Sequence, residues 1–392
     1  PLPVSRVSVV DGSLTYGFGA EADPWEIRVD TLVYVLPREG QNQKGQISGQ
    51  LSYAGDAIEV SGALGSLNGL VSDQLAPVNL TFVGNGVSGS VSGAVNNLRT
   101  ASNADLYLEV STGRLERNLT DLLPGLPWQN DAIFSGTVNA TGHLVGSPGR
   151  DLRLESVRLS TTAQPLNFTA QGDLDLVPAN VRRNRSIGEL RLQMKNQSLQ
   201  ELAALMSLDV LTDVRVSGQG ILSGQPGDFH LGQIMLIGES PRLGIQLTGN
   251  VSHLGLADGP DLALNIEATS DKLTELLRQF KLEVPLSGSA QVTGALHGNY
   301  KGYRLSDLSA SFDTTDLTLE GTGQFDLLQN SFEGQFGFTA RTGSVRSLAD
   351  SLGRQFPVDA TARANGVLTC ANSSCGIEIV NVAINSPQLE VS

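Results

Sequence analysis

The chain of 392 residues has little positive charge, few aromatic side chains and only two cysteines. Its 26 Lys and Arg face 40 Asp and Glu, which gives a formal net charge of −14. Nucleic acids are bound through clustered Lys and Arg that neutralise phosphates, so this balance argues against a nucleic-acid partner. No run approaches the roughly 20 consecutive apolar residues of a membrane-spanning helix. Charged residues make up only 17% and glycines number 44, which excludes an acidic disordered tail and a coiled coil.

The two ends of the sequence also lack features. It opens Pro-Leu-Pro-Val-Ser, without the basic and then apolar segments of a signal peptide. It stops at Leu389-Glu390-Val391-Ser392, an alternation typical of the middle of a strand. We therefore expect a fragment of a longer protein, with any export signal or membrane anchor outside it.

Motifs of catalysis and cofactor binding are missing too. Residues 84–89 match the dinucleotide-binding glycine pattern, but an alternating strand follows where that motif needs a helix, so Asn85-Gly86 predicts a hairpin turn. Asp173 and Asp175 share the polar face of a strand, which favours a solvated edge over a glycosidase pair. The four histidines are far from each other and from the cysteines. The sequence thus predicts no enzyme, no cofactor and no metal site.

Cys370 and Cys375 enclose four residues, a spacing different from the two-residue gap of redox pairs. We predict that they form a disulfide, which favours an oxidising compartment. The alternative is a pair of free thiols.

Most of the sequence alternates apolar and polar residues with period two, as in Phe134 to Leu144. That period is typical of strands with one apolar face. Strands buried on both faces of a parallel sheet would be continuously apolar. We therefore predict a mainly β chain, whose mostly antiparallel sheet has one dry and one wet face.

A repeat runs through the second part of the chain. Short leucine-rich helices are predicted around 115–123, 199–206, 273–280 and 345–352, and each needs a surface to cover its apolar stripe. After each comes a strand with two small residues six apart, beginning at positions 136, 218, 288 and 360. The next strand breaks phase, as Leu305 followed by Leu308 does, which indicates a β-bulge.

These features define the predicted organisation. Residues 1–110 form a strand-rich segment, and residues 111–392 continue its sheet as four repeats, about 111–188, 189–260, 261–330 and 331–392. Units this small cannot close individually, so we predict one elongated, repetitive sheet with one apolar face. Small residues such as Gly136, Gly142 and Gly294 on the apolar face have two readings. Either a short helix packs closely over them, or the sheet curls tightly there and leaves space.

The repeat resembles that of the AsmA-like proteins. The segments "LTDLLPGLPWQNDAIFSGTVNATGHLVG" and "SDKLTELLRQFKLEVPLSGSAQVTGALHG" show it, as does the opening "PLPVSRVSVVDGSLTY". The resemblance covers nearly the whole chain and consists of residue types, without a catalytic signature. It implies a periplasmic body anchored to the inner membrane by a segment absent from this sequence. It also implies a long, curled sheet with an apolar inner groove that carries phospholipid acyl chains toward the outer membrane, with other envelope proteins as further partners.

Under that reading, the large apolar-face residues of the repeats line the groove. They are Phe134, Val138, Leu144, Leu166, Phe168, Leu174, Leu222, Leu243, Ile245, Leu247, Leu286, Val292, Leu296, Leu317, Leu319, Phe325, Phe336, Val358 and Leu368.

Two other classes of protein fit part of the pattern. One is a structural scaffold of an envelope machine, such as the inner-membrane N component of type II secretion, which has a similar sheet. The other is a secreted adhesin-like β-solenoid, which fits the Gly and Asn content but leaves the leucine helices unexplained.

Overall fold

Long strands make up most of the computed structural model. It describes residues 6–16, 25–36, 44–53, 56–65, 75–84, 86–96, 103–113, 136–147, 151–162, 167–176, 188–201, 213–225, 228–254, 260–275, 287–299, 302–328, 331–371 and 374–386. Within these ranges 21 strands form an open antiparallel sheet, accompanied by three short helices. The predicted mainly β, antiparallel fold with few helices is therefore confirmed.

By its contacts the chain divides into two compact units. The first comprises Pro1–Leu122, Asn130–Gln193 and Ile221–Pro226, and the second comprises Leu123–Gln129, Met194–Gly220 and Gly227–Ser392. Each unit is described here by itself.

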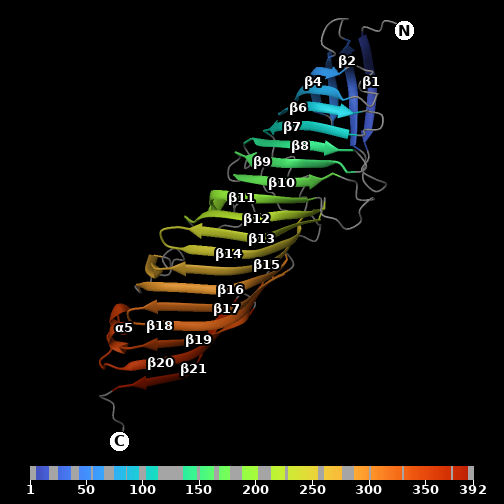
Figure 1. Ribbon diagram of the computed structural model, residues 1–392. Helices are drawn as coiled ribbons and strands as arrows, with labels where there is room; N and C mark the ends of the chain where they lie inside the picture. Colours follow the sequence, from blue (N-terminus) through green and yellow to red (C-terminus); the bar gives the residue numbers. More distant parts are fainter. Residues whose placement is uncertain are drawn as a thin grey trace. The chain divides into compact units, whose positions relative to one another are not determined.

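The first unit contains ten consecutive strands in which each pairs antiparallel with the next. They are β1 (Arg6–Tyr16), β2 (Trp25–Val35), β3 (Lys44–Tyr53), β4 (Asp56–Gly65), β5 (Ala76–Gly84), β6 (Val87–Asn96), β7 (Asn103–Thr112), β8 (Val138–Gly146), β9 (Arg153–Thr161) and β10 (Phe168–Asp175). In Figure 1, β1 and β2 run across the direction of β6–β8, so the sheet of this unit is strongly curled. Gly84 pairs directly with Val87, and the predicted hairpin at Asn85-Gly86 is thus confirmed.

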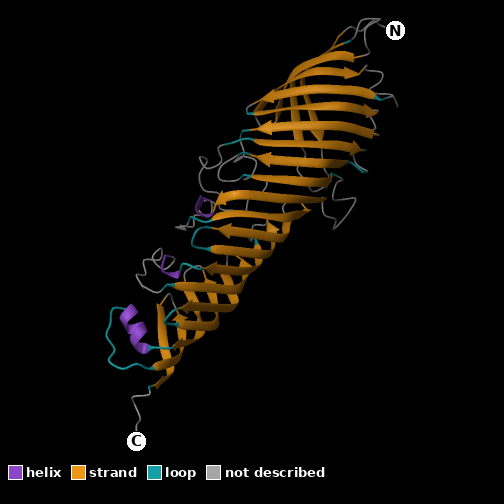
Figure 2. Cartoon of the chain, turned by 60° about the vertical axis from the view of Figure 1, so that its left-hand side comes forward, coloured by secondary structure: helices purple, strands orange, loops and turns teal. Residues whose placement is uncertain are grey.

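Two strands have residues in both units: β11 (Gly188–Ser198) and β12 (Arg215–Gln225). The second unit continues with nine strands, again paired in sequence order. They are β13 (Asp228–Glu239), β14 (Gly244–Leu254), β15 (Asp261–Ser270), β16 (Gly288–Asn299), β17 (Gly302–Thr314), β18 (Thr318–Leu328), β19 (Ser331–Thr342), β20 (Thr361–Ala371) and β21 (Ser374–Asn385). Figure 2 shows these strands bending along their length.

The helices are short and lie outside the sheet. Helix α5 (Val345–Ser351) begins at the N-cap Ser344, whose Oγ accepts the amide of Ser347, and Gly353 follows with φ 68°. It buries none of its residues. Figures 1 and 2 place it beside the strand ends, not over the sheet. Residues 199–201 and 273–275 are helical as predicted, and the amide of Glu201 binds the Oγ of Ser198. The predicted helix at 115–123 lies outside the described residues.

The predicted phase breaks are β-bulges. Pairing shifts register between Leu305 and Leu308, and between Leu231 and Ile234. The residue that takes up the extra length in each has left-handed backbone, with φ 51° at both Asp307 and Gln233. A third predicted bulge, between Leu154 and Val157, contains Ser156 with φ 52°.

The bulges keep the apolar side chains on one face of the sheet. The extra residue of each bulge shifts the alternation by one position. An apolar residue three positions further on, instead of two, therefore still lies on the same face. The exposed amide left at the bulge is bonded by a polar side chain of the next strand. Asp173 Oδ1 accepts the amide of Ser156 at 2.8 Å, and Asn250 Oδ1 accepts that of Gln233 at 3.2 Å.

A substitution at Asp307 tests the bulge. Left-handed backbone is strained for β-branched residues, so Asp307→Val should lower the free energy of unfolding by about 1–3 kcal/mol. Asp307→Gly should leave it unchanged or raise it, because glycine adopts this conformation freely. The control is Ser309→Val, at an exposed extended position of the same strand. Equal denaturant midpoints for Asp307→Val and Ser309→Val would contradict the assigned bulge.

Candidate functional site

The apolar faces of the strands join into rows that run from strand to strand. In the second unit three such rows cross β13–β21, each formed by residues that pair directly opposite one another or follow a bulge. Row A is Gly238, Ile245, Ala268, Val292, Ala310, Gly321, Phe338, Gly366 and Ile379. Row B is Leu236, Leu247, Ile266, Gly294, Leu308, Gly323, Phe336, Leu368 and Ile377. Row C is Ile234, Gly249, Leu264, Leu296, Leu305, Phe325, Gly334, Cys370 and Cys375.

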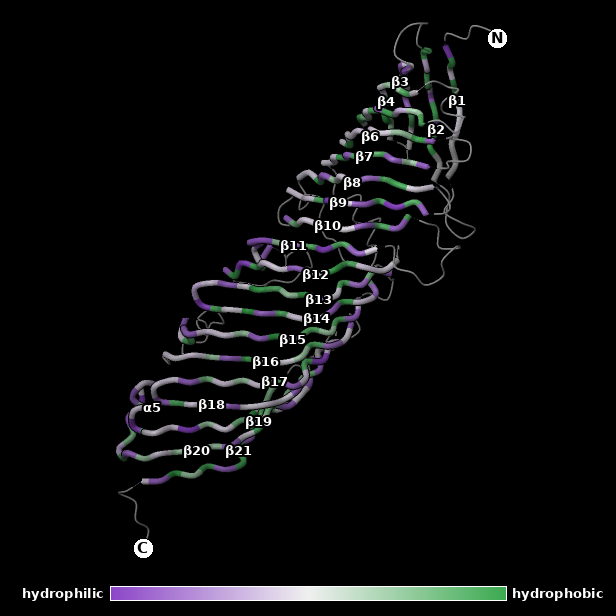
Figure 3. The backbone as a smooth tube through the Cα atoms, viewed as in Figure 1, coloured by the Kyte–Doolittle hydropathy of each residue, from purple (hydrophilic) through white to green (hydrophobic). Residues whose placement is uncertain are grey.

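The first unit has the same construction. One row is Leu32, Gly49, Val60, Phe82, Gly89, Val110, Ala140, Leu159 and Ala170. On the same face, four or five residues away along each strand, lies the row of Gly45, Leu64, Val78, Gly93, Leu106, Leu144, Leu154 and Leu174. None of the residues in these five rows carries a charge. Figure 3 shows the matching alternation of hydrophobic and hydrophilic residues along the strands.

Burial follows the alternation in interior strands such as β7, β11 and β15, whereas every residue of the edge strand β21 is exposed. Along β15 the apolar Leu264 and Ile266 are half-buried, whereas the intervening Asn265 and Glu267 are exposed. Among the described elements, extensive contacts join only strands that are neighbours in the sheet, so no second layer of described residues packs on the rows. In the first unit the buried Ala76, Val78 and Val95 pack against Leu64, Leu80, Val91 and Leu106 of the same face. Because one face is crowded without a covering layer, we infer that each sheet curls toward its apolar face.

The space around the glycines also differs between the two faces. A Cβ placed on Gly334, in row C, would lie 2.5 Å from the ring of Phe325. A Cβ on Gly337, on the opposite face of the same strand, would meet only a carbonyl oxygen at 3.9 Å. The apolar face is therefore the crowded, inner side of the curl, and the polar face is the open side.

The structure brings together most of the predicted lining residues that it describes. Those within rows of the second unit are Ile245, Leu247, Val292, Leu296, Phe325, Phe336 and Leu368. Leu319 pairs with Phe312 in the row next to row A. In the first unit Leu144 and Leu174 lie in a row, Val138 pairs with Thr112 on the same face, and Phe168 is two residues before Ala170 of that face.

The remaining predicted residues stand apart from the paired rows. Leu243 and Leu317 precede β14 and β18, where their carbonyls accept the turn amides of Ser240 and Thr314. Val358 lies between α5 and β20, and Leu222 is half-buried in β12. Phe134, Leu166 and Leu286 lie outside the described residues.

Several row residues were not predicted as lining, including Phe82, Leu264, Ile266, Leu305 and Phe338. Their own strands show the period-two signal, so extending it to every strand would have found them. What the period does not show is which residue lies opposite which on the next strand.

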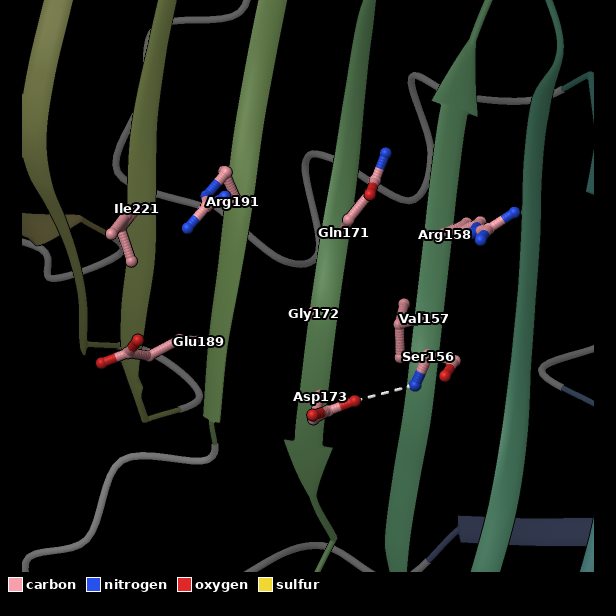
Figure 4. Close-up of a pocket in the computed structure, with 9 residues that line it drawn as sticks. All are labelled: Ser156, Val157, Arg158, Gln171, Gly172, Asp173, Glu189, Arg191 and Ile221. Carbon is pink, nitrogen blue, oxygen red and sulfur yellow. Dashed lines mark hydrogen bonds between the residues drawn. The ribbon is translucent and has the colours of Figure 1, made fainter.

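The opposite face is polar and mixed in charge. A hollow of about 390 Å³ on this face of the first unit lies beside the bulge at Ser156, between strands that carry both signs of charge (Figure 4). Its lining is Ser156, Val157, Arg158, Gln171, Gly172, Asp173, Glu189, Arg191 and Ile221. Such a lining does not suit a hydrocarbon, so the candidate site for an apolar ligand is the row-bearing face.

Ion pairs join neighbouring strands on the polar face. Arg304 donates to both carboxylate oxygens of Asp326, at 2.6 and 3.2 Å, across β17 and β18. This hydrogen bonding lowers the pKa of Asp326 and raises that of Arg304. Both side chains are exposed, so the pair serves solubility and register more than stability.

A disulfide joins Cys370 and Cys375, as predicted. The two residues lie directly opposite each other across the β20–β21 hairpin, at the end of row C. Cys370 is buried. No group of His, Cys, Asp and Glu suited to a metal ion occurs among the described residues, and none of their helices is long and apolar enough to cross a membrane.

Comparison of the chain with protein-family models, with curated proteins and with solved structures gave no match.

Tyr34 ties the apolar face of β2 to the end of β4. The ring is buried, and its hydroxyl donates to the carbonyl oxygen of Gly65 at 2.7 Å. Desolvation by burial raises the pKa of Tyr34 above its ordinary value of 10.0, and a backbone hydrogen bond with Gly45 opposes this.

Removing this hydroxyl should weaken the first unit. Tyr34→Phe should cost about 0.5–1.5 kcal/mol of unfolding free energy, because Gly65 loses its donor. The neutral phenol is favoured in the fold, so its contribution is present below pH 10 and is lost as pH rises through the raised pKa. The difference between wild type and variant should therefore shrink in alkali. Tyr107→Phe, at an exposed ring, is the control, and denaturation at several pH values gives the readout. A constant difference across pH, or equal effects of the two variants, would refute the assignment.

Proposed function

We propose that the chain is a non-enzymatic lipid conduit whose row-bearing face holds phospholipid acyl chains. One observation carries the proposal: uncharged apolar rows continue through nine successive strands of the second unit without a second layer of described residues over them. Soluble proteins rarely leave so large an apolar surface uncovered unless it binds something.

The dimensions of the face suit long hydrocarbon chains. Strands are spaced by about 4.8 Å, so the eight intervals from β13 to β21 give a row length of about 38 Å. Neighbouring rows are two residues apart, or about 6.7 Å. Three rows therefore offer a band wide enough for more than one extended acyl chain, side by side.

Burial of the tails supplies the binding energy. Each CH₂ transferred from water to an apolar surface contributes about 0.8 kcal/mol. The phosphate head group stays in water at the mouth of the groove, because the rows offer it no cation. This division accounts for a lipid-binding protein with net charge −14.

The disulfide is typical of an oxidising compartment. We propose that this compartment is the periplasm, with anchoring to the inner membrane by a segment outside this sequence, and with transfer of lipid toward the outer membrane. This part of the proposal depends on the resemblance to AsmA-like proteins.

The compartment can be tested by labelling thiols in intact cells before lysis. We expect Cys370 and Cys375 to resist labelling until a reductant is added. Labelling of both cysteines without reductant would contradict an oxidising compartment.

A charge placed in the groove should stop lipid binding. Leu368→Asp puts a carboxylate in row B between Phe336 and Ile377, where it has no partner and would meet the acyl chain. Thr369→Asp is the matched control, because Thr369 is exposed on the other face and pairs with the neutral Gln335 and Gly376. Phospholipid that copurifies with each protein is measured by native mass spectrometry, and folding by circular dichroism.

We expect lipid with wild type and Thr369→Asp, and little with Leu368→Asp. Should Leu368→Asp fail to fold, Leu368→Asn replaces it at lower desolvation cost. Wild-type protein purified gently without lipid, and unable to take up phosphatidylglycerol from vesicles, would overturn the conduit in favour of the scaffold.

A further inference from the structure

We propose that pairs of an aromatic residue and a glycine hold the groove open, by letting each ring lie flat on the sheet where it would otherwise project into the path of the acyl chain. The inference rests on the proposed function and adds to it a clearance device. It assigns to the glycines a role different from both that were predicted, cover by a helix or an empty space.

The pair of Phe336 and Gly321 shows the arrangement. Phe336 belongs to β19 and Gly321 to the neighbouring β18. A Cβ built on Gly321 would lie 2.4 Å from Cε1 and 2.6 Å from Cζ of the phenyl ring. The far end of the ring thus occupies the place where a side chain of residue 321 would begin. A ring in that place runs along the sheet surface toward β18.

The same contact recurs in both units. The ring of Phe338 reaches within 2.5 Å of the Cβ position of Gly366, and that of Phe325 does so at Gly334. In the first unit Phe82 approaches the Cβ position of Gly89 to 2.4 Å. Tyr34 lies equally over the Cβ position of Gly45.

Flat rings have a consequence for the groove. In a two-layer protein, large side chains project from the sheet and interdigitate with the opposite layer. Here each aromatic ring lies along the sheet toward the next strand. The apolar area of the ring is therefore retained, while the side chain projects less far above the sheet. A low, uncharged surface suits a flexible, unbranched hydrocarbon chain that can slide along it. It is less suited to a rigid ligand that is held by its shape.

Adding one methyl group should raise a ring into the groove. Non-bonded carbon atoms need about 3.5–4.0 Å, so Gly321→Ala forces the Phe336 ring to move by more than about 1 Å. The sheet lies beneath the ring, and a backbone oxygen 2.7 Å from the Cβ position closes the space beside it. The ring can then move only away from the sheet.

The experiment compares four proteins: wild type, Gly321→Ala, the double variant Gly321→Ala/Phe336→Ala, and Gly337→Ala. Gly337 is the matched control, since it is on the polar face of β19 with open space around its Cβ position. Each is loaded from vesicles of dioleoyl phosphatidylglycerol, and bound lipid per protein is measured by mass spectrometry. We expect Gly321→Ala to bind at least about fivefold less lipid, because the raised ring obstructs the path of the acyl chain; fivefold corresponds to about 1 kcal/mol.

The double variant should recover wild-type loading, because it removes the displaced ring. Loading is compared only among proteins with the circular dichroism of wild type, so that a loss of folding is not taken for a loss of lipid binding. Gly337→Ala should bind as wild type does. If Gly321→Ala does not fold, Gly366→Ala with and without Phe338→Ala provides the same comparison at a second pair.

Two outcomes separate this inference from the proposed function. Normal loading of Gly321→Ala, or reduced loading that the double variant does not restore, would overturn the clearance device while leaving the conduit intact. Absence of loading in wild type itself would overturn the conduit.

Discussion

Every feature of this chain depends on keeping one face of the pleated sheet in phase from strand to strand. Side chains of a strand alternate faces, so an error of one residue would move an entire apolar set into water. The bulges at Ser156, Gln233 and Asp307 prevent this error, since each takes up the extra residue in left-handed backbone. The hydrogen-bonded side chains of Asp173 and Asn250 satisfy amides that two of these bulges expose. Register is thus maintained by local polar contacts on the wet face.

Curvature follows from how bulk is distributed on the dry face. Rings and leucine side chains lie over glycines of the adjacent strand, as Phe338 does over Gly366 and Leu154 over Gly142. Close cross-strand contact of this kind stabilises a sheet over which the described residues form no second layer. The same contact brings large apolar side chains nearer to one another and so shields them partly from water. Stability and an open apolar surface are therefore compatible in one layer.

The polar face has a different role. Its charges alternate in sign across neighbouring strands, as in Arg304 with Asp326 and Arg153 with Asp175. Such exposed pairs add little stability. They keep the outer surface hydrated and make slipped registers unfavourable, because a slip would bring like charges together or place them on the apolar side.

The sequence by itself determined the strands, their facing, the bulges, the hairpin at Asn85-Gly86 and the Cys370–Cys375 pair, because each depends on neighbours close along the chain. Period-two alternation also identified residues such as Leu247 and Phe336 as belonging to the apolar face. Only the tertiary structure decided which residues meet across strands, since register depends on backbone pairing between distant segments. It placed the ring of Phe336 over Gly321 and left α5 beside the sheet, where the sequence had predicted cover for its apolar stripe. The period-two alternation shows that small residues lie on the apolar face. What occupies the space above them is determined by the neighbouring strand.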